Sequence, residues 1–401
     1  MSGHDWGRAS PLEDVAGQVA IVGVGESDHT RASGRSTVEI VAQAVERALW
    51  DAGLSPCDID GIMYLPSMGD QFDEHAYRRH FGTDHEMWVS HEGGGMRWAG
   101  TAPYAAAVAL REGRARYVLN TFGVAWATRR SEMVGGPGES HARELFKQNL
   151  EVPFGWFPQP VYFATIARRH MHEFGTTEEQ LGAVAVACRR HATLTPSAVM
   201  RERPLTLEQY LASPYLVDPF RKEDCCLISD GGGAYIMTTP ERARDLRKPV
   251  VEVAGVGLGT SATGVHWAQQ PAFTSTPQVF SAPAAFAMAG IGPDDVDVLA
   301  CYDPFTINTV MYVEDMGFCA KGEGGPFVAS GALHFDSGIL PYNTHGGLLS
   351  HAYVLGIAHV VELVRQLRGE CGARQVPGAE IAVYGGYTGP EASTLVLRRA
   401  R

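Results

Sequence analysis

Four short segments of the chain combine glycine with polar or ionisable side chains, as enzyme active sites often do. They are residues 91–96 (HEGGGM), 301–306 (CYDPFT), 343–353 (NTHGGLLSHAY) and 385–390 (GGYTGP). The first can present backbone N–H groups at a helix start, where an oxyanion or a phosphate could bind. The others bring phenols, imidazoles and a carboxylate, which can transfer protons. No GK[ST] sequence follows the first segment, so it is not a P-loop, and the chain has no HExxH motif.

The elements around these segments occur twice. Residues 52–60 (AGLSPCDID) run into the apolar GIMYL, and residues 289–297 (AGIGPDDVD) run into the apolar VLACY. Each copy follows a stretch with helical spacing and, before that, an apolar strand; the helical stretches are 36–51 and 275–288, and the strands are 19–25 and 250–255. Strands that alternate with helices predict a mostly parallel sheet flanked by helices. The repeat therefore predicts a duplicated α/β unit.

The remaining elements fit this plan. We expect a buried helix over 101–111 and strands over 117–122 and 231–237. Residues 126–225 break the pattern and predict an inserted loop or lid domain, because so long a stretch is not a simple connection. The predicted halves are residues 17–248, which include this insertion, and residues 249–401. Segment 301–306 stands at the carboxyl end of a repeat strand, a favoured place for function, and segment 343–353 opens a helix that ends near Arg368.

Composition excludes several classes of protein. The chain of 401 residues carries 45 acidic and 33 Lys or Arg residues, a formal charge of −12 that disfavours a nucleic-acid partner. No apolar run is long enough to cross a bilayer, and the first residues lack the pattern of a secretory signal. The seven cysteines form no CxxC pair and no Cys/His ligand array. We therefore expect a cytoplasmic protein without a metal site and without a membrane partner.

Three motifs carry a resemblance to a known family. Residues 217–231 (VDPFRKEDCCLISDG) are similar to the "PLR…DCC…DGA" segment of the sterol-carrier-protein thiolases. Residues 343–356 resemble their "NPSGG…GHP.GA" motif, and residues 302–306 align with their "HDCFT" motif. With the internal repeat, the chain resembles this branch of the thiolase superfamily from about residue 18 to 399. The resemblance implies an α/β thiolase fold: duplicated βαβαβαββ halves in a five-layered αβαβα arrangement, with an inserted loop domain.

The departures from the family pattern change the expected chemistry. Thiolases carry a nucleophilic cysteine at the start of the helix after the glycine-rich segment. This chain has no cysteine there, and none in the glycine loop at 385–390. Tyr302 replaces the histidine of "HDCF", and Tyr353 replaces the histidine of "GHP". A Claisen condensation through an acyl-enzyme is therefore not expected.

This pattern most resembles the steroid side-chain-cleaving aldolases, thiolase-like lipid-transfer proteins of actinobacterial sterol catabolism. The resemblance implies a carbon–carbon lyase that performs retro-aldol cleavage of a 17-hydroxy steroid with a 22-oyl-CoA side chain. The products would be a 17-ketosteroid and propionyl-CoA. No cofactor is implied, since CoA is part of the substrate. The resemblance also implies a small OB-fold partner of the DUF35 type and a homodimer within a heterotetramer.

The resemblance also assigns roles to residues. Tyr302 and Tyr353 are the expected acid/base pair, with the two roles undecided, because retro-aldol cleavage needs a base for the β-hydroxyl and an acid for the α-carbon. His345 and Asp303 are expected to tune them. The enolate oxygen needs fixed donors, for which the candidates are Gly386 and the backbone of Gly93, Gly94 and Gly95, with Asn343 as a further substrate-binding residue. Two alternatives stay open: an atypical CoA acyltransferase, and a non-catalytic acyl-CoA or sterol carrier.

Overall fold

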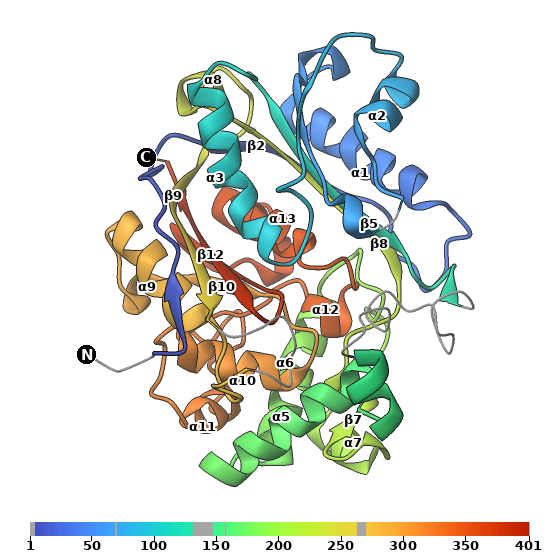
Figure 1. The fold of residues 1–401 in the computed structure, drawn as a ribbon, viewed down its shortest axis with the longest axis vertical. Coiled ribbons are helices and arrows are strands. Elements are labelled where there is room, and N and C mark those ends of the chain that lie inside the picture. The colour runs from blue at the N-terminus through green and yellow to red at the C-terminus, as the bar shows by residue number, and fades with distance from the viewer. Residues whose placement is uncertain (1–4, 69, 131–146, 157, 263–269, 401) are drawn as a thin grey trace.

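The apolar runs pair edge to edge in one mixed sheet. The computed structural model describes residues 5–68, 70–130, 147–156, 158–262 and 270–400 (Figure 1). The strands of the sheet are β1 (Gly7–Ala9), β2 (Ala20–Glu26), β3 (Gly61–Met63), β4 (Trp88–Ser90), β5 (Val118–Ala125), β8 (Asp230–Thr238), β9 (Val251–Ser261), β10 (Val298–Cys301), β11 (Ile381–Tyr387) and β12 (Glu391–Arg399). Their order is β10-β11-β12-β9-β2-β8-β5-β3-β4, and β1 pairs with β9. Most of these pairings are antiparallel; among the described strands only β10–β11, β3–β4 and β3–β5 are parallel, so the expectation of a mostly parallel sheet was wrong.

The strand order repeats on the two sides of the sheet's centre. The two sides meet where β2 pairs with β9 at Ala20–Glu252 and Ile21–Val251. Outward from this junction the order is β2-β8-β5-β3-β4 on one side and β9-β12-β11-β10 on the other. Next to β10, Tyr342 forms a parallel bridge with Leu299. This bridge corresponds to the parallel pairing of β4 with β3 at the other end of the sheet. The predicted duplication is confirmed, whereas the boundary at residue 248 stays a prediction.

Helices cover both faces of the sheet. Helix α1 (Thr37–Ala52) packs on β2, β8 and β5, and α9 (Gln278–Ala289) packs on β9 and β12. Helices α3 (Arg97–Arg111) and α13 (Ile357–Arg368) contact each other and the strands of both halves. Figure 1 shows α3 in front of β9 and β12, with α13 beside it. Because α3 and α13 contact strands of both halves, they form the inner helical layer, and α1 and α9 form the outer layers. This is the predicted αβαβα order.

Glycines bring each outer helix close to its sheet. A Cβ atom on Gly25 of β2 would lie 2.1 Å from the carbonyl oxygen of Ala44 in α1. A Cβ atom on Gly257 of β9 would lie 2.0 Å from the carbonyl oxygen of Ser281 in α9. Both distances are far below van der Waals contact, so only glycine allows this approach. The two halves therefore use the same packing device.

The predicted insertion forms a helical region beyond the sheet. It contains α5 (Gln159–Phe174), α6 (Glu178–Thr193), α7 (Leu207–Ala212) and a hairpin of β6 (Tyr215–Val217) and β7 (Phe220–Arg221). Residues 131–146 and 157 of the predicted insertion lie outside the described residues. Helix α6 packs against α10 (Thr306–Asp315), α11 (Gly324–Ala329) and α12 (Gly347–Ser350), in the lower part of Figure 1. The insertion thus lies against the segments that carry the candidate site.

Short helices complete the described chain. They are α2 (Glu74–Phe81), α8 (Pro240–Ala243), η1 (Pro56–Asp58), η2 (Pro66–Met68), η3 (Lys147–Glu151), η4 (Val152–Phe154), η5 (Lys222–Asp224), η7 (Pro293–Asp295) and η8 (Gly372–Arg374). Within the described ranges, no helix is both long and apolar enough to cross a membrane. The cytoplasmic location stays a prediction.

One predicted helix is broken in two. The sequence predicts a single helix from the glycine turn at 343–347 to Arg368, but α12 ends at Ser350 and α13 begins at Ile357. Leu355 and Gly356 have φ angles of +49° and +86°, which a right-handed helix cannot contain. The carbonyl oxygen of Leu355 accepts a hydrogen bond from the N–H of Met96, at the start of α3. Tyr353 lies in this break.

Candidate active site

Two tyrosine side chains from distant segments meet at the carboxyl end of β10. The hydroxyl oxygens of Tyr302 and Tyr353 lie 3.1 Å apart, and the residues are only 7% and 6% exposed. Tyr302 follows β10 directly, and its carbonyl oxygen accepts a hydrogen bond from the hydroxyl of Tyr312 at 2.9 Å. The backbone N–H of Tyr353 donates to the Ser229 hydroxyl at 2.8 Å. The sequence thus predicted a pair that the fold does bring together.

Burial sets the protonation state of this pair. Loss of hydration raises the pKa of both phenols above its ordinary value of 10, and the neighbouring Cys226 thiol acts in the same direction on both. Both hydroxyls are therefore neutral near pH 7. One hydroxyl donates its hydrogen bond to the other, and the second hydroxyl can therefore donate its own proton to a third group, such as a substrate. The pair is thus a neutral proton donor in this state.

Asp303 anchors the backbone next to the pair. Its Oδ1 accepts hydrogen bonds from the backbone N–H of Leu348 at 2.8 Å and from Nε2 of His359 at 3.0 Å. A Cβ atom on Gly347 would lie 2.1 Å from Asp303 Oδ2, so the carboxylate needs a glycine at that turn. These hydrogen bonds hold the start of α12 and do not reach the tyrosine hydroxyls. His359 was missed by the sequence interpretation, because a histidine within an apolar helix carries no distinguishing signal.

His345 lies among other histidines. Its ring centroid is 4.6 Å from that of His359 and 4.8 Å from that of His351. Burial lowers its pKa well below the ordinary value of 6.5, so the ring is neutral near pH 7. Neither of its nitrogens has a hydrogen-bond partner among the described residues. His345 therefore contacts the histidine that binds Asp303, and its expected tuning role stays a prediction.

Two of the predicted oxyanion and substrate-binding groups are already engaged. The N–H of Gly94 donates to Asn120 Oδ1 at 2.7 Å, and its carbonyl oxygen accepts from Asn120 Nδ2 at 3.2 Å. The side-chain amide of Asn343 pairs in the same way with the N–H and carbonyl of Cys301, at 3.0 and 3.1 Å. In this structure these groups hold the backbone beside the site, and their expected oxyanion and substrate-binding roles stay predictions. Gly93 lies in close contact, since its Cβ would be 2.5 Å from that of Met63.

Gly386 lets β11 approach the start of α3. A Cβ atom on Gly386 would lie 2.6 Å from the carbonyl oxygen of Met96. The Gly386 carbonyl oxygen accepts from Gln278 Nε2 at 3.0 Å, and its predicted oxyanion role stays a prediction. Met96 occupies the N-cap of α3, directly after the glycines that stand where thiolases carry their nucleophilic cysteine. A thioether has no acidic proton and cannot form the thioester of an acyl-enzyme.

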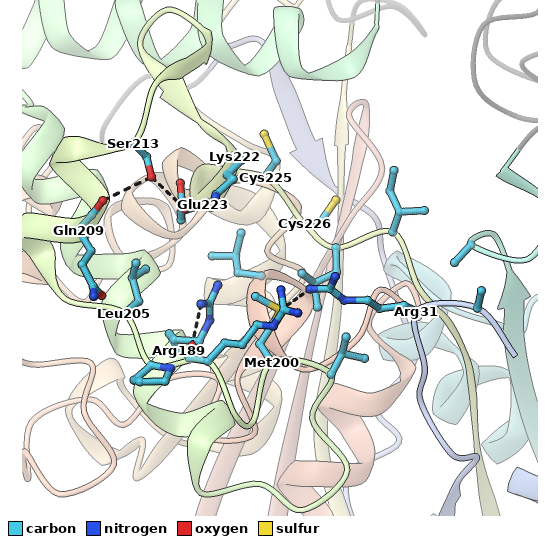
Figure 2. A pocket seen from close by; sticks show the side chains of 18 of the residues that line it. Arg31, Arg189, Met200, Leu205, Gln209, Ser213, Lys222, Glu223, Cys225 and Cys226 are labelled. Atoms are coloured by element: carbon cyan, nitrogen blue, oxygen red, sulfur yellow. Dashed lines mark hydrogen bonds and ion pairs between the residues drawn. The ribbon is translucent and has the colours of Figure 1, made fainter.

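A cavity of about 810 Å³, shown in Figure 2, is lined by residues from the insertion and from both halves of the chain, although neither tyrosine lines it. Its lining includes five cationic side chains and one carboxylate, Glu223; the cations are Arg31, Arg130, Arg189, Arg203 and Lys222. The rest of the wall is mostly apolar, with Met200, Leu205 and Leu349 among its side chains, and also includes Gln209 and Ser213. Cys226 also lines the cavity and lies close enough to both phenols to affect their pKa values. The cavity therefore combines positive charge with an apolar wall and ends near the tyrosines.

The cations of the cavity are only partly paired. Lys222 lies 3.5 Å from Glu223, and Arg189 donates to the Ser350 hydroxyl and to the Arg203 carbonyl, both at 2.9 Å. Figure 2 shows Arg31 reaching toward Met200, whose sulfur lies 3.8 Å from Arg31 Nη2. No carboxylate in the described part of the chain pairs with Arg31, Arg130 or Arg203. The sequence interpretation missed these residues because they come from separate segments that only the fold brings together.

Known proteins resemble this chain over nearly its whole length. Residues 259–399 match the family described as "Thiolase C-terminal domain-like". The "17-hydroxy-3-oxo-4-pregnene-20-carboxyl-CoA lyase" of Mycobacterium tuberculosis is 36% identical over 96% of this chain and 100% of its own. The "Steroid side-chain-cleaving aldolase" of Thermomonospora curvata is 34% identical over 96% of this chain and 98% of its own. A solved "Ltp2-ChsH2(DUF35) aldolase" superposes with a TM-score of 0.86 at 33% identity, covering 97% of this chain and 100% of that one.

Proposed function

Since the chain belongs to the thiolase superfamily, among the steroid side-chain-cleaving aldolases, we propose that it is a retro-aldol carbon–carbon lyase. The substrate is a 17-hydroxy steroid with a 22-oyl-CoA side chain, and the products are a 17-ketosteroid and propionyl-CoA, formed in steroid side-chain degradation. The observation that carries this proposal is the hydroxyl contact of 3.1 Å between Tyr302 and Tyr353, in a chain without a cysteine at the thiolase nucleophile position.

The reaction is a balanced movement of one proton and one electron pair. The bond between carbon 17 and the α-carbon of the thioester breaks, and its electrons form the enolate. The hydroxyl on carbon 17 loses its proton and becomes the ketone, while the α-carbon gains a proton. Nothing is oxidised or reduced, so the cleavage needs no redox cofactor, in line with the proposal that CoA enters only as part of the substrate.

The tyrosines act as a proton relay. One hydroxyl accepts the proton of the substrate hydroxyl while the pair passes a proton on to the α-carbon. Such a relay uses neutral phenols, which the raised pKa values of Tyr302 and Tyr353 favour. A phenolate formed in advance would have to be buried as an isolated charge, which costs several kcal/mol or more. Which tyrosine faces the ketone stays open, and Asp303 positions the backbone between them.

The cavity is proposed to hold the CoA part of the substrate. CoA carries a pyrophosphate and a further phosphate, and arginine side chains bind phosphate oxygens through paired N–H groups. Arg31, Arg130 and Arg203 are the cations without a carboxylate partner in the described chain. The volume of about 810 Å³ lies within the usual range of small-molecule sites, about 300–1,000 Å³. The thioester end would then point past Cys226 to the tyrosines.

We also propose the assembly that the sequence predicted: a homodimer joined by a small OB-fold DUF35-type partner in a heterotetramer. The solved relative whose description includes DUF35 supports the partner. Strand β4 ends the sheet, and its three residues Trp88–Ser90 are only partly buried in the single chain. An open strand edge is a natural pairing surface. Strand β5 pairs with β3 on one side and with β8 on the other, so it offers no free edge. We therefore place the dimer contact at β4.

The test is a product assay on the chain purified together with its DUF35-type partner. The steroid 17-hydroxy acyl-CoA should yield the 17-ketosteroid and propionyl-CoA in equal amounts, and in D₂O the propionyl group should carry one deuterium on its α-carbon. The matched substrate without the 17-hydroxyl should stay intact, because it has no proton to release. Tight binding without products would identify a carrier instead, and a protein mass increased by an acyl group would identify an acyltransferase.

A further inference from the structure

A second cluster of chemically active side chains lies outside the tyrosine pair and the cavity. Glu26 ends β2, His29 follows three residues later, and His351 follows α12 in the other half of the chain. All three residues are buried or nearly so, and one ligand atom from each lies within 4.8 Å of the others. His29 Nδ1 and His351 Nε2 are 3.3 Å apart, and Glu26 Oε1 lies 3.6 Å from His351 Nε2 and 3.9 Å from His29 Nε2.

The cluster leaves buried polar atoms without partners. Glu26 Oε1, His29 Nε2 and His351 Nδ1 have no hydrogen-bond partner among the described residues. Arg365 forms an ion pair with the other oxygen of Glu26, so its guanidinium fixes the carboxylate and leaves Oε1 facing the two imidazoles. A buried polar atom without a partner costs about 1–3 kcal/mol. Of these three atoms, Glu26 Oε1 is also one of the closely spaced ligand atoms, together with His29 Nδ1 and His351 Nε2. It is a buried carboxylate oxygen without a donor that faces two imidazole rings, a place where a cation could bind.

We propose that Glu26, His29 and His351 bind one divalent transition-metal ion, with Zn²⁺ as the first candidate. Zinc bonds to nitrogen and oxygen are about 2.0–2.2 Å long, so the donor atoms of a tetrahedral site lie about 3.3–3.6 Å apart. The contacts of 3.3 and 3.6 Å at His351 Nε2 match this spacing. Two imidazoles and a carboxylate are a donor set that zinc commonly takes. The Ser197 hydroxyl, 3.0 Å from His351 Nε2, lies beside the fourth position.

The protonation states suit a metal ion. Burial lowers the pKa of His29 and lowers that of His351 to about 3, so both rings are neutral and keep a free lone pair. Burial alone would raise the pKa of Glu26, but the Arg365 guanidinium holds it low, at about 2, so this group is an anion. Arg365 acts as the outer partner that orients the carboxylate ligand, a usual feature of metal sites.

The bound ion would be a brace between the two halves of the chain. Glu26 and His29 belong to the first half, whereas His351 lies two residues before Tyr353 in the break between α12 and α13. None of the three has a hydrogen bond to a tyrosine hydroxyl, so the ion holds structure and takes no part in the cleavage. Motif spacing could not predict this site, because His29 and His351 are 322 residues apart in the sequence. Metal binding at this cluster is independent of the proposed cleavage.

The test is metal content and metal-dependent stability of the full-length chain, purified with its partner and without chelators. We expect about one zinc per chain by mass spectrometry of the elements, and a Tm that falls after dialysis against a chelator and returns with Zn²⁺. Co²⁺ added to the stripped protein should give the strong visible absorption of a tetrahedral site. This measurement needs no variant, so it holds even if a substituted chain does not fold.

Matched variants locate the ion. Glu26→Gln keeps the shape of the side chain but removes its charge, and together with His351→Ala it should weaken Zn²⁺ binding at least about tenfold to a hundredfold, the loss typical even of outer-shell changes. His80→Ala is the control, because His80 and Glu46 form a more exposed pair at 2.7 Å; this variant should keep the zinc. A stripped wild-type chain that neither binds Co²⁺ nor gains Tm with Zn²⁺ would overturn the proposal, as would equal binding by Glu26→Gln.

Discussion

Removal of either tyrosine hydroxyl is the sharpest perturbation of the proposed reaction. Tyr302→Phe and Tyr353→Phe each delete one oxygen and leave the ring to pack. Because the two hydroxyls contact each other at 3.1 Å, each variant also leaves the other hydroxyl buried without its partner. The free energy of unfolding should therefore fall by about 1–3 kcal/mol, which leaves the protein folded.

Turnover should fall much further than stability. Proton transfer by a positioned group contributes about 10²–10⁴-fold, which corresponds to about 3–5 kcal/mol of the activation barrier. KM should change little, since the CoA contacts lie at the cationic wall of the cavity. The double variant should be only slightly worse than the worse single variant, because both groups act in one step. Single-turnover formation of propionyl-CoA measures the chemical step directly.

Tyr235→Phe is the matched control. Its hydroxyl is also buried, and it donates to the carbonyl oxygen of Ala99 at 2.8 Å, away from the tyrosine pair. The variant also loses the hydrogen bond that this hydroxyl makes with Asn120, so its stability should fall by a similar amount while turnover stays within about threefold. If Tyr302→Phe and Tyr353→Phe both keep turnover within about tenfold of the wild type in the folded state, the relay is refuted and the carrier alternative gains.

Three further predictions concern the cysteines, the cavity and the acid stability. Each of the seven cysteines replaced by Ser should keep turnover within about tenfold, about 1.4 kcal/mol of barrier, and a larger loss in one folded variant would restore a covalent mechanism. Arg31→Gln and Arg203→Gln should raise KM for the acyl-CoA at least about tenfold with kcat nearly unchanged, whereas Glu223→Gln should not; an unchanged KM in both arginine variants would place CoA elsewhere. Burial, aided by the nearby His334, lowers the pKa of His191 from 6.5 to about 3 in the folded chain. This lowered pKa gives stability that is complete above about pH 6.5 and is lost as the pH falls toward 3, at up to about 1.4 kcal/mol per pH unit. The free energy of unfolding, measured with urea, should therefore fall between pH 7.5 and pH 5 by about 2 kcal/mol less in His191→Gln than in the wild type. An equal fall in both proteins would contradict this assignment.

The fold was accessible from the sequence because its signals are local. Ser36 and Glu39 form a capping box at the start of α1, and Gly53, with φ of +73°, ends the helix. The bounds of the helix can therefore be predicted from residues adjacent in the sequence. The break between α12 and α13 could not be predicted, since Leu355 has a positive φ that its type does not suggest. That conformation depends on the hydrogen bond from Met96, which is distant in sequence.

The candidate site was accessible only in part. Tyr302 and Tyr353 were identified because they stand at two histidine positions of a known family, and the fold confirms that they meet. The hydrogen bonds of Gly94 and Asn343 could not be predicted, since a sequence does not show which backbone groups are already hydrogen-bonded. The arginines of the cavity were missed for a related reason: a charge without a partner is recognisable only after the fold has shown which charges have one.

The position of Tyr353 depends on both halves of the chain, and this dependence suits a relay between neutral groups. Ser229 holds its N–H, Leu355 is held by Met96 at the start of α3, and Asp303 holds Leu348 at the start of α12. A charged base could act over a range of distances through its field, but a relay needs two hydroxyls within hydrogen-bond reach at the moment of cleavage. The segment is therefore fixed at several backbone atoms, although it lies outside any helix or strand. The same requirement supports the proposed positioning role of Asp303, which touches neither hydroxyl but holds the backbone from which one of them projects.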